Sequence, residues 1–298
     1  MPKPWSDFEA LRARSVGLIR KAAALAERVS PGRPPILAFS GGKDSQALYH
    51  LAEEAGAPFE AVMKATSIDP PEVIRFVRKH YPAVRIDAPR ESFWALCERK
   101  GMLPTMRCRF CCAELKETDG AGRVTLTGVR RQESQRRADR QEVSVRRGKR
   151  FAQFTMDQFS RVAETSAECM GGGRERIVVN PILEWAEADV WRYLNDVAQV
   201  PHCPLYDRGR RRVGCLFCPM SSAASIVRDA LEYPHQWERL KRTAARICVG
   251  HPFFKGRPGE YLEWWISKKN VAEFMASRLP LGDIEAAVDL SIAKQRFG

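Results

Sequence analysis

The stretch best suited to chemistry is the hexapeptide Ser40-Gly41-Gly42-Lys43-Asp44-Ser45. It follows the apolar run at 35–39 and precedes a helix-like pattern at 46–52. Glycines let backbone N–H groups approach an anion, the two serine hydroxyls add donors, and the positive end of the next helix dipole faces the loop. Lys43 contributes a full positive charge. The sequence therefore predicts a phosphate-binding loop between a strand and a helix.

Two other interpretations of this loop compete with a nucleotide site. It is not the Walker pattern, which needs four residues between its first glycine and a Gly-Lys pair followed by Ser or Thr. A glycine-rich turn that merely starts a helix is the simpler alternative. The complete hexapeptide in a strand-to-helix setting favours a nucleotide site over that turn.

The cysteines form a second set of reactive side chains. The chain has nine, and six fall in the groups Cys108-x-x-Cys111-Cys112, Cys203 and Cys215-x-x-Cys218. A Cys-x-x-Cys pair places two thiolates on one turn, at a separation suited to one metal or one cluster face. Structural zinc, a [4Fe–4S] cluster and a redox-active disulfide all remain open on these spacings. The isolated Cys97, Cys169 and Cys248 are interpreted as small buried hydrophobic residues.

Alternating strands and helices must position these groups. We expect a helix over 7–30, a helix over 70–80 and another over 185–194. The strands are expected at 35–39, 59–63, 84–87 and 124–128. This order is typical of an α/β fold with a doubly wound, mostly parallel sheet, whose ligands bind at the carboxyl ends of the strands. The loops after Phe39 and Gly128 lie at two such ends.

The rest of the chain is organised around this region. Residues 136–176 lack long apolar runs and are expected to form a mobile excursion. Residues 221–298 are expected to be helical, with aromatic side chains that pack a core rather than stack on bases. The predicted division is an N-terminal helix at 1–30, a nucleotide-binding domain that contains the hexapeptide loop and the cysteine site at 31–220, and a helical C-terminal region at 221–298.

The composition favours a globular protein with an anionic partner. Of the 298 residues, 44% are hydrophobic and 29% are charged, and the formal net charge is +13. Such a charge suits a nucleotide, a sulfate or a nucleic acid. No apolar run is long enough to cross a bilayer, and the N-terminus lacks a secretory apolar region. We therefore expect a cytoplasmic protein that does not associate with membranes.

Taken together, several motifs resemble the phosphoadenosine phosphosulfate (PAPS) reductase family, within the PP-loop superfamily of adenine-nucleotide α-hydrolases. They occur in the family's order between about residues 35 and 220. Besides the hexapeptide, they are Phe110-Cys111-Cys112-Ala113-Glu114-Leu115-Lys116, Gly128-Val129-Arg130-Arg131-Gln132-Glu133-Ser134, Asn180-Pro181-Ile182-Leu183, Tyr206-Asp207-Arg208-Gly209 and Gly214-Cys215-x-x-Cys218-Pro219.

The resemblance implies roles for individual residues. The hexapeptide would hold the phosphates of ATP, or of PAPS or adenylyl sulfate, with Lys43 and Asp44 taking part in catalysis and Asp44 helping to position Mg²⁺. Lys116 would place a positive charge near the cluster or the sulfur group. A second loop would bind nucleotide or substrate oxyanions. Its residues are Gly128, Arg130, Glu133, Ser134 and Arg137.

The cysteine pattern is similar to that of cluster-bearing adenylyl-sulfate reductases, which implies [4Fe–4S] more than zinc. Cys215 and Cys218 are the first expected ligands, followed by one or both of Cys111 and Cys112. Cys203 competes for the last place, because cluster-bearing relatives outside the reductases place a ligand there.

One departure from the family bears on function. Assimilatory reductases carry a nucleophilic cysteine in a C-terminal Glu-Cys-Gly-Leu-His-type tail, whereas this chain's last cysteine is Cys248. Reduction of PAPS or adenylyl sulfate therefore becomes the alternative. The leading expectation is an ATP pyrophosphatase or sulfurtransferase that acts at the α-phosphate and uses an iron–sulfur cluster.

The acceptor of such an enzyme stays open. The arginine-rich stretch from Arg130 to Arg150 suits the backbone of DNA or tRNA, and a small-molecule acceptor fits nearly as well. A sulfur-donor protein is a further expected partner. A different class of function is a non-catalytic nucleotide-binding module with structural zinc, which would bind ATP without releasing pyrophosphate.

Overall fold

A computed structural model describes residues 5–117, 120–147, 150–165 and 175–278. The chain divides into two compact units, and neither is a single continuous segment. The first unit comprises 1–65, 69–88 and 116–214. The second comprises 66–68, 89–115 and 215–298, so a segment inside the predicted nucleotide-binding region folds with the C-terminal helices.

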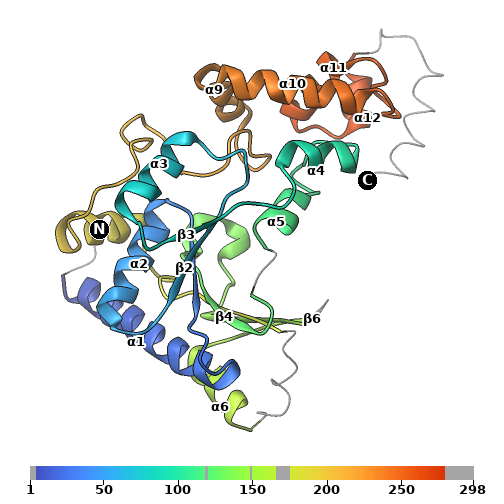
Figure 1. The fold of residues 1–298 in the computed structure, drawn as a ribbon. Helices are drawn as coiled ribbons and strands as arrows, with labels where there is room; N and C mark the ends of the chain where they lie inside the picture. The colour runs from blue at the N-terminus through green and yellow to red at the C-terminus, as the bar shows by residue number, and fades with distance from the viewer. Residues whose placement is uncertain (1–4, 118–119, 148–149, 166–174, 279–298) are drawn as a thin grey trace. The chain divides into compact units, whose positions relative to one another are not determined.

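The first unit is built on a seven-stranded sheet of order β3-β2-β1-β4-β7-β5-β6 (Figure 1). The strands β3, β2, β1, β4 and β7 pair in parallel, and β5 and β6 are antiparallel additions. This arrangement confirms the predicted α/β class with a mostly parallel sheet. The bounds are β1 Ile36–Phe39, β2 Glu60–Lys64, β3 Arg85–Asp87, β4 Arg123–Leu126, β5 Val143–Arg147, β6 Arg150–Phe154 and β7 Arg176–Val179.

The helices of the first unit follow the apolar periodicity of the sequence. Helix α3 begins at Pro71, where the missing N–H of proline costs no hydrogen bond. The helix predicted at 185–194 is α-helical only over Glu187–Arg192, and the chain then continues as one turn of π-helix over Tyr193–Val197. The bounds are α1 Trp5–Val29, α2 Lys43–Ala55, α3 Pro71–His80, α6 Met156–Thr165, α8 Glu187–Arg192 and the π-helical η3 Tyr193–Val197.

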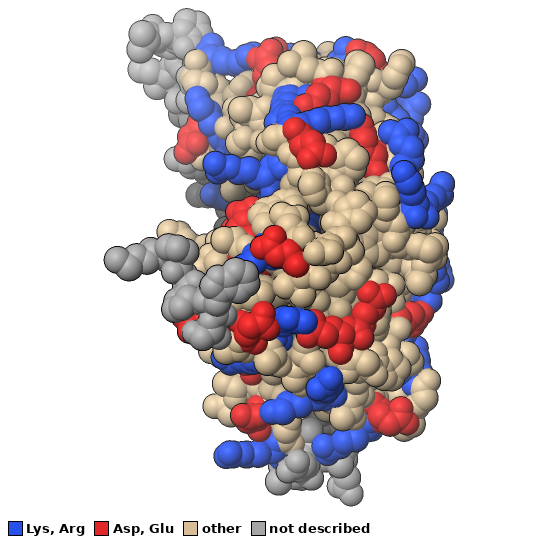
Figure 2. All heavy atoms as spheres, turned by 90° about the vertical axis from the view of Figure 1, so that its left-hand side faces the viewer, with Lys and Arg blue, Asp and Glu red and all other residues tan. Residues whose placement is uncertain are grey.

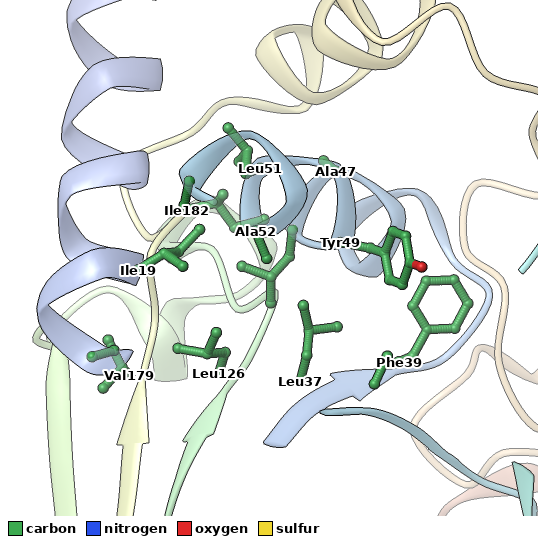
Figure 3. Packing of buried hydrophobic residues seen from close by; sticks show 14 of the residues in the cluster. Ile19, Leu37, Phe39, Ala47, Tyr49, Leu51, Ala52, Leu126, Val179 and Ile182 are labelled. Atoms are coloured by element: carbon green, nitrogen blue, oxygen red, sulfur yellow. The ribbon is translucent and has the colours of Figure 1, made fainter. Parts of the chain in front are cut away.

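Helix α2 is held in place by an apolar face that packs on the sheet (Figure 3). Leu37 of β1 and Ala47, Leu51 and Ala52 of α2 are fully buried. Ile19 of α1 lies beside the same helix in Figure 3. Full burial of a leucine or isoleucine side chain contributes about 1.5–3 kcal/mol. This packing fixes the start of α2, and therefore the hexapeptide loop, at the end of β1.

The hairpin of β5 and β6 was not foreseen from the sequence. It lies within 136–176, for which an excursion was expected, and β5 pairs antiparallel with β7. Arg146 and Arg150 interrupt any apolar run there, and Phe151 is 59% exposed. Val143 of β5 pairs with Val179 of β7, and both side chains are fully buried. The hairpin is therefore specified by pairing with β7 more than by its own apolar pattern.

The second unit is helical and is organised around buried aromatic side chains. Tyr261 and Phe254 are fully buried, and Trp265 is buried as well. The Tyr261 hydroxyl accepts the Leu103 N–H at 2.7 Å, which satisfies its polar end. The expected packing role of these aromatics is confirmed. The bounds are α4 Phe93–Lys100, α5 Phe110–Leu115, α9 Ala223–Glu232, α10 Pro234–Cys248, α11 Pro258–Ser267 and α12 Val271–Ala276.

Two of the three isolated cysteines belong to this core. Cys97 and Cys248 are fully buried, and burial raises the pKa of both thiols. Their interpretation as small hydrophobic residues is confirmed, whereas Cys169 lies outside the described residues. Within the described ranges, no helix combines the length and the apolarity that crossing a bilayer requires.

Candidate active site

The hexapeptide lies at the switch point of the parallel sheet. Strand β1 pairs with β2 on one side and with β4 on the other. From β1, the strands β2 and β3 follow on one side of the sheet, and β4 is added on the opposite side. The loops that follow β1 and β4 therefore meet at the same edge, where open α/β sheets bind their ligands. The predicted juxtaposition of the two loops is present in the first unit.

Hydrogen bonds between the two serines close the loop after β1. The Ser40 N–H donates to Ser45 Oγ at 3.1 Å, and the two hydroxyl oxygens are also 3.1 Å apart. Ser45 Oγ donates to the Gly42 carbonyl at 2.8 Å. Gly41 has φ of +72°, and a Cβ there would lie 2.8 Å from Val73 Cγ1. The loop is thus pre-shaped, and its tightest point admits only glycine.

Lys43 is a buried cation at the first turn of α2. Its side chain is 2% exposed, and Nζ lies 3.3 Å from Glu187 Oε1 and 3.6 Å from Asp44 Oδ2. Nζ also donates to the Arg211 carbonyl at 3.3 Å. A buried ammonium is costly unless it is paired, so these carboxylates balance it. An arriving phosphate would find this positive charge together with the positive end of the α2 dipole.

Asp44 and Arg130 join the two loops. Arg130 Nε donates to Asp44 Oδ1 at 2.6 Å, and the Arg130 side chain is 5% exposed. Gly128 permits this approach, because a Cβ there would lie 2.9 Å from the Asp44 carbonyl oxygen and 3.0 Å from its carbon. The contact connects the predicted phosphate loop to the predicted second loop. Asp44 thereby sits between two cations, Lys43 and Arg130.

The remaining residues of the second loop occupy two short turns, η1 (Arg131–Glu133) and η2 (Gln135–Arg137). Glu133 accepts the Arg130 N–H at 3.0 Å and forms ion pairs with Arg137 and with Arg212. Ser134 is exposed and has an extended backbone. The loop presents several guanidinium groups, but Glu133 already neutralises part of their charge.

Tyr206 is a site residue to which the sequence reasoning gave no role. Its hydroxyl oxygen accepts the Lys43 N–H at 2.8 Å, and Lys43 Nζ lies 5.6 Å from the centre of its ring. Burial raises the pKa of Tyr206, so it is neutral at ordinary pH. The available signal was its place in the Tyr-Asp-Arg-Gly motif. One loop N–H that an anion would use is therefore occupied by a phenol.

Four of the predicted cluster ligands belong to the second unit. Cys111 hydrogen-bonds with Cys112, and that bond, burial and the nearby Cys215 and Cys218 raise its thiol pKa. Cys215 Sγ also lies 3.4 Å from Thr66 Oγ1. Over the described residues, no three or more His, Cys, Asp or Glu side chains are arranged to hold a metal ion. Cys112, Cys215 and Cys218 thus all lie near enough to Cys111 to influence its thiol.

Two further predicted residues, Cys203 and Lys116, belong to the first unit. Cys203 is fully buried in the core of the first unit, and burial is the main reason that its thiol pKa is raised. Lys116 is exposed, and it is the first residue of the segment 116–214 of the first unit. Their predicted roles, as a cluster ligand and as a positive charge beside the sulfur group, stay predictions.

Comparison with known proteins gives the family. The family model described as "Phosphoadenosine phosphosulfate reductase domain" matches residues 34–221, which is more than half of the chain. The chain belongs to the PAPS reductase family. The resemblance inferred from the motifs is thereby confirmed, and the matched range includes both loops and all the predicted cysteine ligands.

Curated relatives of this family member are distant. An uncharacterized protein of Methanocaldococcus jannaschii is 29% identical over 78% of the chain and 52% of its own length. A second uncharacterized protein of that organism is 25% identical over 80% of the chain and 47% of its own length. Sulfate adenylyltransferase subunit 2 of Nocardia farcinica is 27% identical over 70% of the chain and 68% of its own length. The chain thus spans about half the length of the two M. jannaschii proteins.

A solved PAPS reductase from Candida auris, in complex with phosphate, is also similar. It is 18% identical in sequence, with a TM-score of 0.41 over 72% of this chain and 97% of that chain.

The surface charge of this PAPS reductase family member is mixed on the face drawn in Figure 2. Lysines and arginines alternate there with acidic residues, although the chain carries a formal net charge of +13. Among the described residues drawn there, neither unit shows a continuous basic field of the kind that tracks a nucleic-acid backbone.

Proposed function

We propose that this protein is a PP-loop enzyme that acts at the α-phosphate of ATP or a related adenine nucleotide. The supporting observation is the contact between Arg130 and Asp44, which joins the loops after β1 and β4 at the switch point of the sheet. Lys43 and the start of α2 add positive charge at the same place. Sites of this construction stabilise charge as it develops on phosphate oxygens.

The proposed reaction is an attack by an acceptor oxygen on the α-phosphorus. The new oxygen–phosphorus bond forms as the bond to the bridging oxygen of the β-phosphate breaks, and the electron pair leaves with pyrophosphate. A sulfur nucleophile would then attack the adenylated acceptor, and AMP would leave with the electron pair of the acceptor–oxygen bond that breaks. The loop N–H groups, Lys43 and Arg130 would hold the oxyanions in place. Asp44 is the carboxylate suited to Mg²⁺, which when bound neutralises phosphate charge.

The second part of the proposal is sulfur transfer supported by an iron–sulfur cluster. Cys111, Cys112, Cys215 and Cys218 supply four thiols in one unit, which is the number that a [4Fe–4S] cluster takes. The electrostatic influence of Cys215 and Cys218 on the Cys111 thiol supports a common site. Such a cluster, when bound, supplies redox and sulfur chemistry. The same four thiols suit zinc, which is the competing occupant.

Reduction of PAPS or adenylyl sulfate is the weaker proposal. That chemistry needs an accessible nucleophilic thiol. Cys248, the last cysteine of the chain, is fully buried, and burial raises its pKa. A buried neutral thiol is a poor nucleophile, so this side chain does not replace the cysteine of the reductase tail.

A single comparison of products tests the proposal. Anaerobically purified protein is incubated separately with ATP, PAPS and adenylyl sulfate, together with a sulfur source and DNA, tRNA or small-molecule acceptors. We expect AMP and pyrophosphate from ATP. ADP and phosphate would contradict attack at the α-phosphate, and sulfite release from PAPS would favour the reductase. Tight ATP binding without turnover by any acceptor would point to a binding module.

A further inference from the structure

A cavity of about 500 Å³ lies within the second unit, between helices α4 and α10. Its wall includes Ser92, Trp94, Glu98, Arg239, Arg242 and Arg246. Volumes of this size are typical of small-ligand pockets. Helix α10, which supplies the three arginines of the wall, begins after the residues that the family model matches.

The cavity wall carries a net positive charge. The three arginines are spaced along one face of α10, and the first and last are about 10 Å apart along the helix axis. Arg246 Nη1 donates to Glu98 Oε1 at 2.8 Å, so one guanidinium is balanced by the only carboxylate in the wall. Two positive charges remain in the cavity.

The two remaining cations, Arg239 and Arg242, have different surroundings. The guanidinium of Arg239 lies 5.0 Å from the centre of the Trp94 ring, which fixes its plane while leaving its N–H groups available. Within the described part of the chain, Arg242 has no ion pair, hydrogen bond or ring contact. An exposed arginine without a partner at the wall of a cavity is free to bind an incoming anion.

Trp94 provides a second, independent observation. Its side chain is 3% exposed, and its indole Nε1–H is buried without a hydrogen-bond partner among the described residues. Leaving such a donor unsatisfied costs about 1–3 kcal/mol. Such a group is rare in native structures, and Trp94 lines the cavity, so its indole N–H reports on changes in the cavity wall.

We propose that this cavity binds a phosphate ester group. A phosphate dianion matches the two uncompensated positive charges, and arginine forks suit its oxygens. Its source is either a small phosphorylated molecule or a phosphate of a nucleic-acid strand. The inference stands independently of the proposed nucleotide chemistry, since no residue of the cavity belongs to the first unit.

The test follows the Trp94 indole N–H by nuclear magnetic resonance, because this signal reports on the cavity and not on the PP-loop. The chain has seven tryptophans, and Trp94→Phe assigns the resonance. Protein is titrated with inorganic phosphate and with a single-stranded hexanucleotide, against chloride at equal ionic strength. We expect saturable movement of the Trp94 signal with phosphate and none with chloride.

Variants of α10 decide whether the arginines are responsible. Arg242→Gln should weaken phosphate binding at least fivefold, and Arg242→Lys, which keeps the charge, about two- to threefold. The matched control is Lys241→Gln, which removes the same charge from an exposed neighbour outside the cavity wall and should change affinity less than twofold. If Trp94→Phe does not fold, calorimetry of Arg242→Gln against Lys241→Gln gives the same comparison.

The outcomes separate the two sources and can overturn the proposal. Saturation by the hexanucleotide at lower concentration than by phosphate assigns the site to nucleic acid. Equal or weaker hexanucleotide binding assigns it to small phosphate esters. An unmoved Trp94 signal, an equal response to chloride, or equal losses in Arg242→Gln and Lys241→Gln would each refute a phosphate site.

Discussion

The backbone N–H of Lys43 donates a 2.8 Å hydrogen bond to the phenolic oxygen of Tyr206. This donor lies at the first residue of α2, where helices leave their N–H groups unpaired and where anions bind. The phenol therefore satisfies a donor that the proposed nucleotide phosphate would otherwise take. Tyr206 and a bound phosphate compete for the same hydrogen.

Replacing Tyr206 with phenylalanine should strengthen binding of pyrophosphate and ATP. In the free variant the Lys43 N–H has lost its phenol acceptor, whereas in the bound variant this N–H donates to the phosphate. Binding therefore gains a hydrogen bond worth about 0.5–1.5 kcal/mol, which lowers the dissociation constant about two- to tenfold. Calorimetry measures the change. The control is Tyr193→Phe, which removes a buried hydroxyl bonded to Glu54 and should leave affinity unchanged. Weaker binding by Tyr206→Phe would show that the phenol assists the ligand.

Gly128→Ala should separate the two loops of the site. The new Cβ would meet the backbone of Asp44 at 2.9–3.0 Å, so one loop must move, at a cost of about 1–3 kcal/mol in stability. Release of pyrophosphate from ATP should fall at least tenfold. Gly17→Ala is the control, since nothing lies within 4 Å of a Cβ there. Wild-type turnover by Gly128→Ala would exclude the close approach as a requirement.

Asp44→Asn should destabilise the free protein more than the ligand-bound protein. The change removes a carboxylate that lies between the buried Lys43 and Arg130, and we expect a loss of about 1–3 kcal/mol in the free energy of unfolding. Urea denaturation with and without pyrophosphate measures it. Pyrophosphate should restore part of the loss, because its charge faces the same cations. Equal losses in both conditions would argue that no anion reaches this pair.

Protein purified without oxygen should contain about four iron and four sulfide per chain and absorb near 400 nm, as expected for one [4Fe–4S] cluster. Cys215→Ser and Cys218→Ser should lose most of the iron. Cys97→Ala, which changes a buried core thiol, should retain it. Stoichiometric zinc in a colourless protein would replace the cluster with a structural metal. Loss of iron from Cys203→Ser as well would add that residue to the ligands.

Stability should fall as the pH decreases below about 6.5, partly because of His251. Burial lowers its pKa, and its Nδ1 accepts the N–H groups of Phe253 and Phe254, so the folded state needs the neutral ring. At acidic pH the unfolded state therefore binds more protons than the folded state. The contribution of His251 to stability is fully present above the pKa that the ring has in the unfolded chain, and it is lost as the pH falls through the lower pKa of the folded state. Urea midpoints between pH 7.5 and 5 should vary less in His251→Asn than in the wild type. The exposed His235→Gln is the control.

The sequence was sufficient to predict β1, β2, β3 and β4 of the sheet and the main loops of the site, whereas β5, β6 and β7 were not predicted. The apolar run before Ser40 and the alternating Val124-Thr125-Leu126-Thr127 stretch before Gly128 are strand signals, and a parallel sheet brings their carboxyl ends together. The contact between Arg130 and Asp44 follows from that geometry, although its partners could not be named from spacing alone.

The features that escaped prediction depend on contacts between distant parts of the chain. The hairpin of β5 and β6 contains no long apolar run, and β5 is held by pairing with β7. Tyr206 reaches Lys43 across 163 positions in sequence, a relation that no local pattern encodes. Residues 89–115 fold with the C-terminal helices, and this too depends on packing between segments that are far apart in the sequence.

The aromatic core of the second unit limits how the chain can be shortened. Phe93, Trp94 and Leu103 lie within the range that matches the family model, whereas Tyr261 and Trp265 follow it. A fragment ending at residue 221 would leave those three side chains without their covering helices and would leave the Leu103 N–H without its acceptor. The homologous segment is therefore not a folding unit, and its aromatic residues would promote aggregation if it were produced alone.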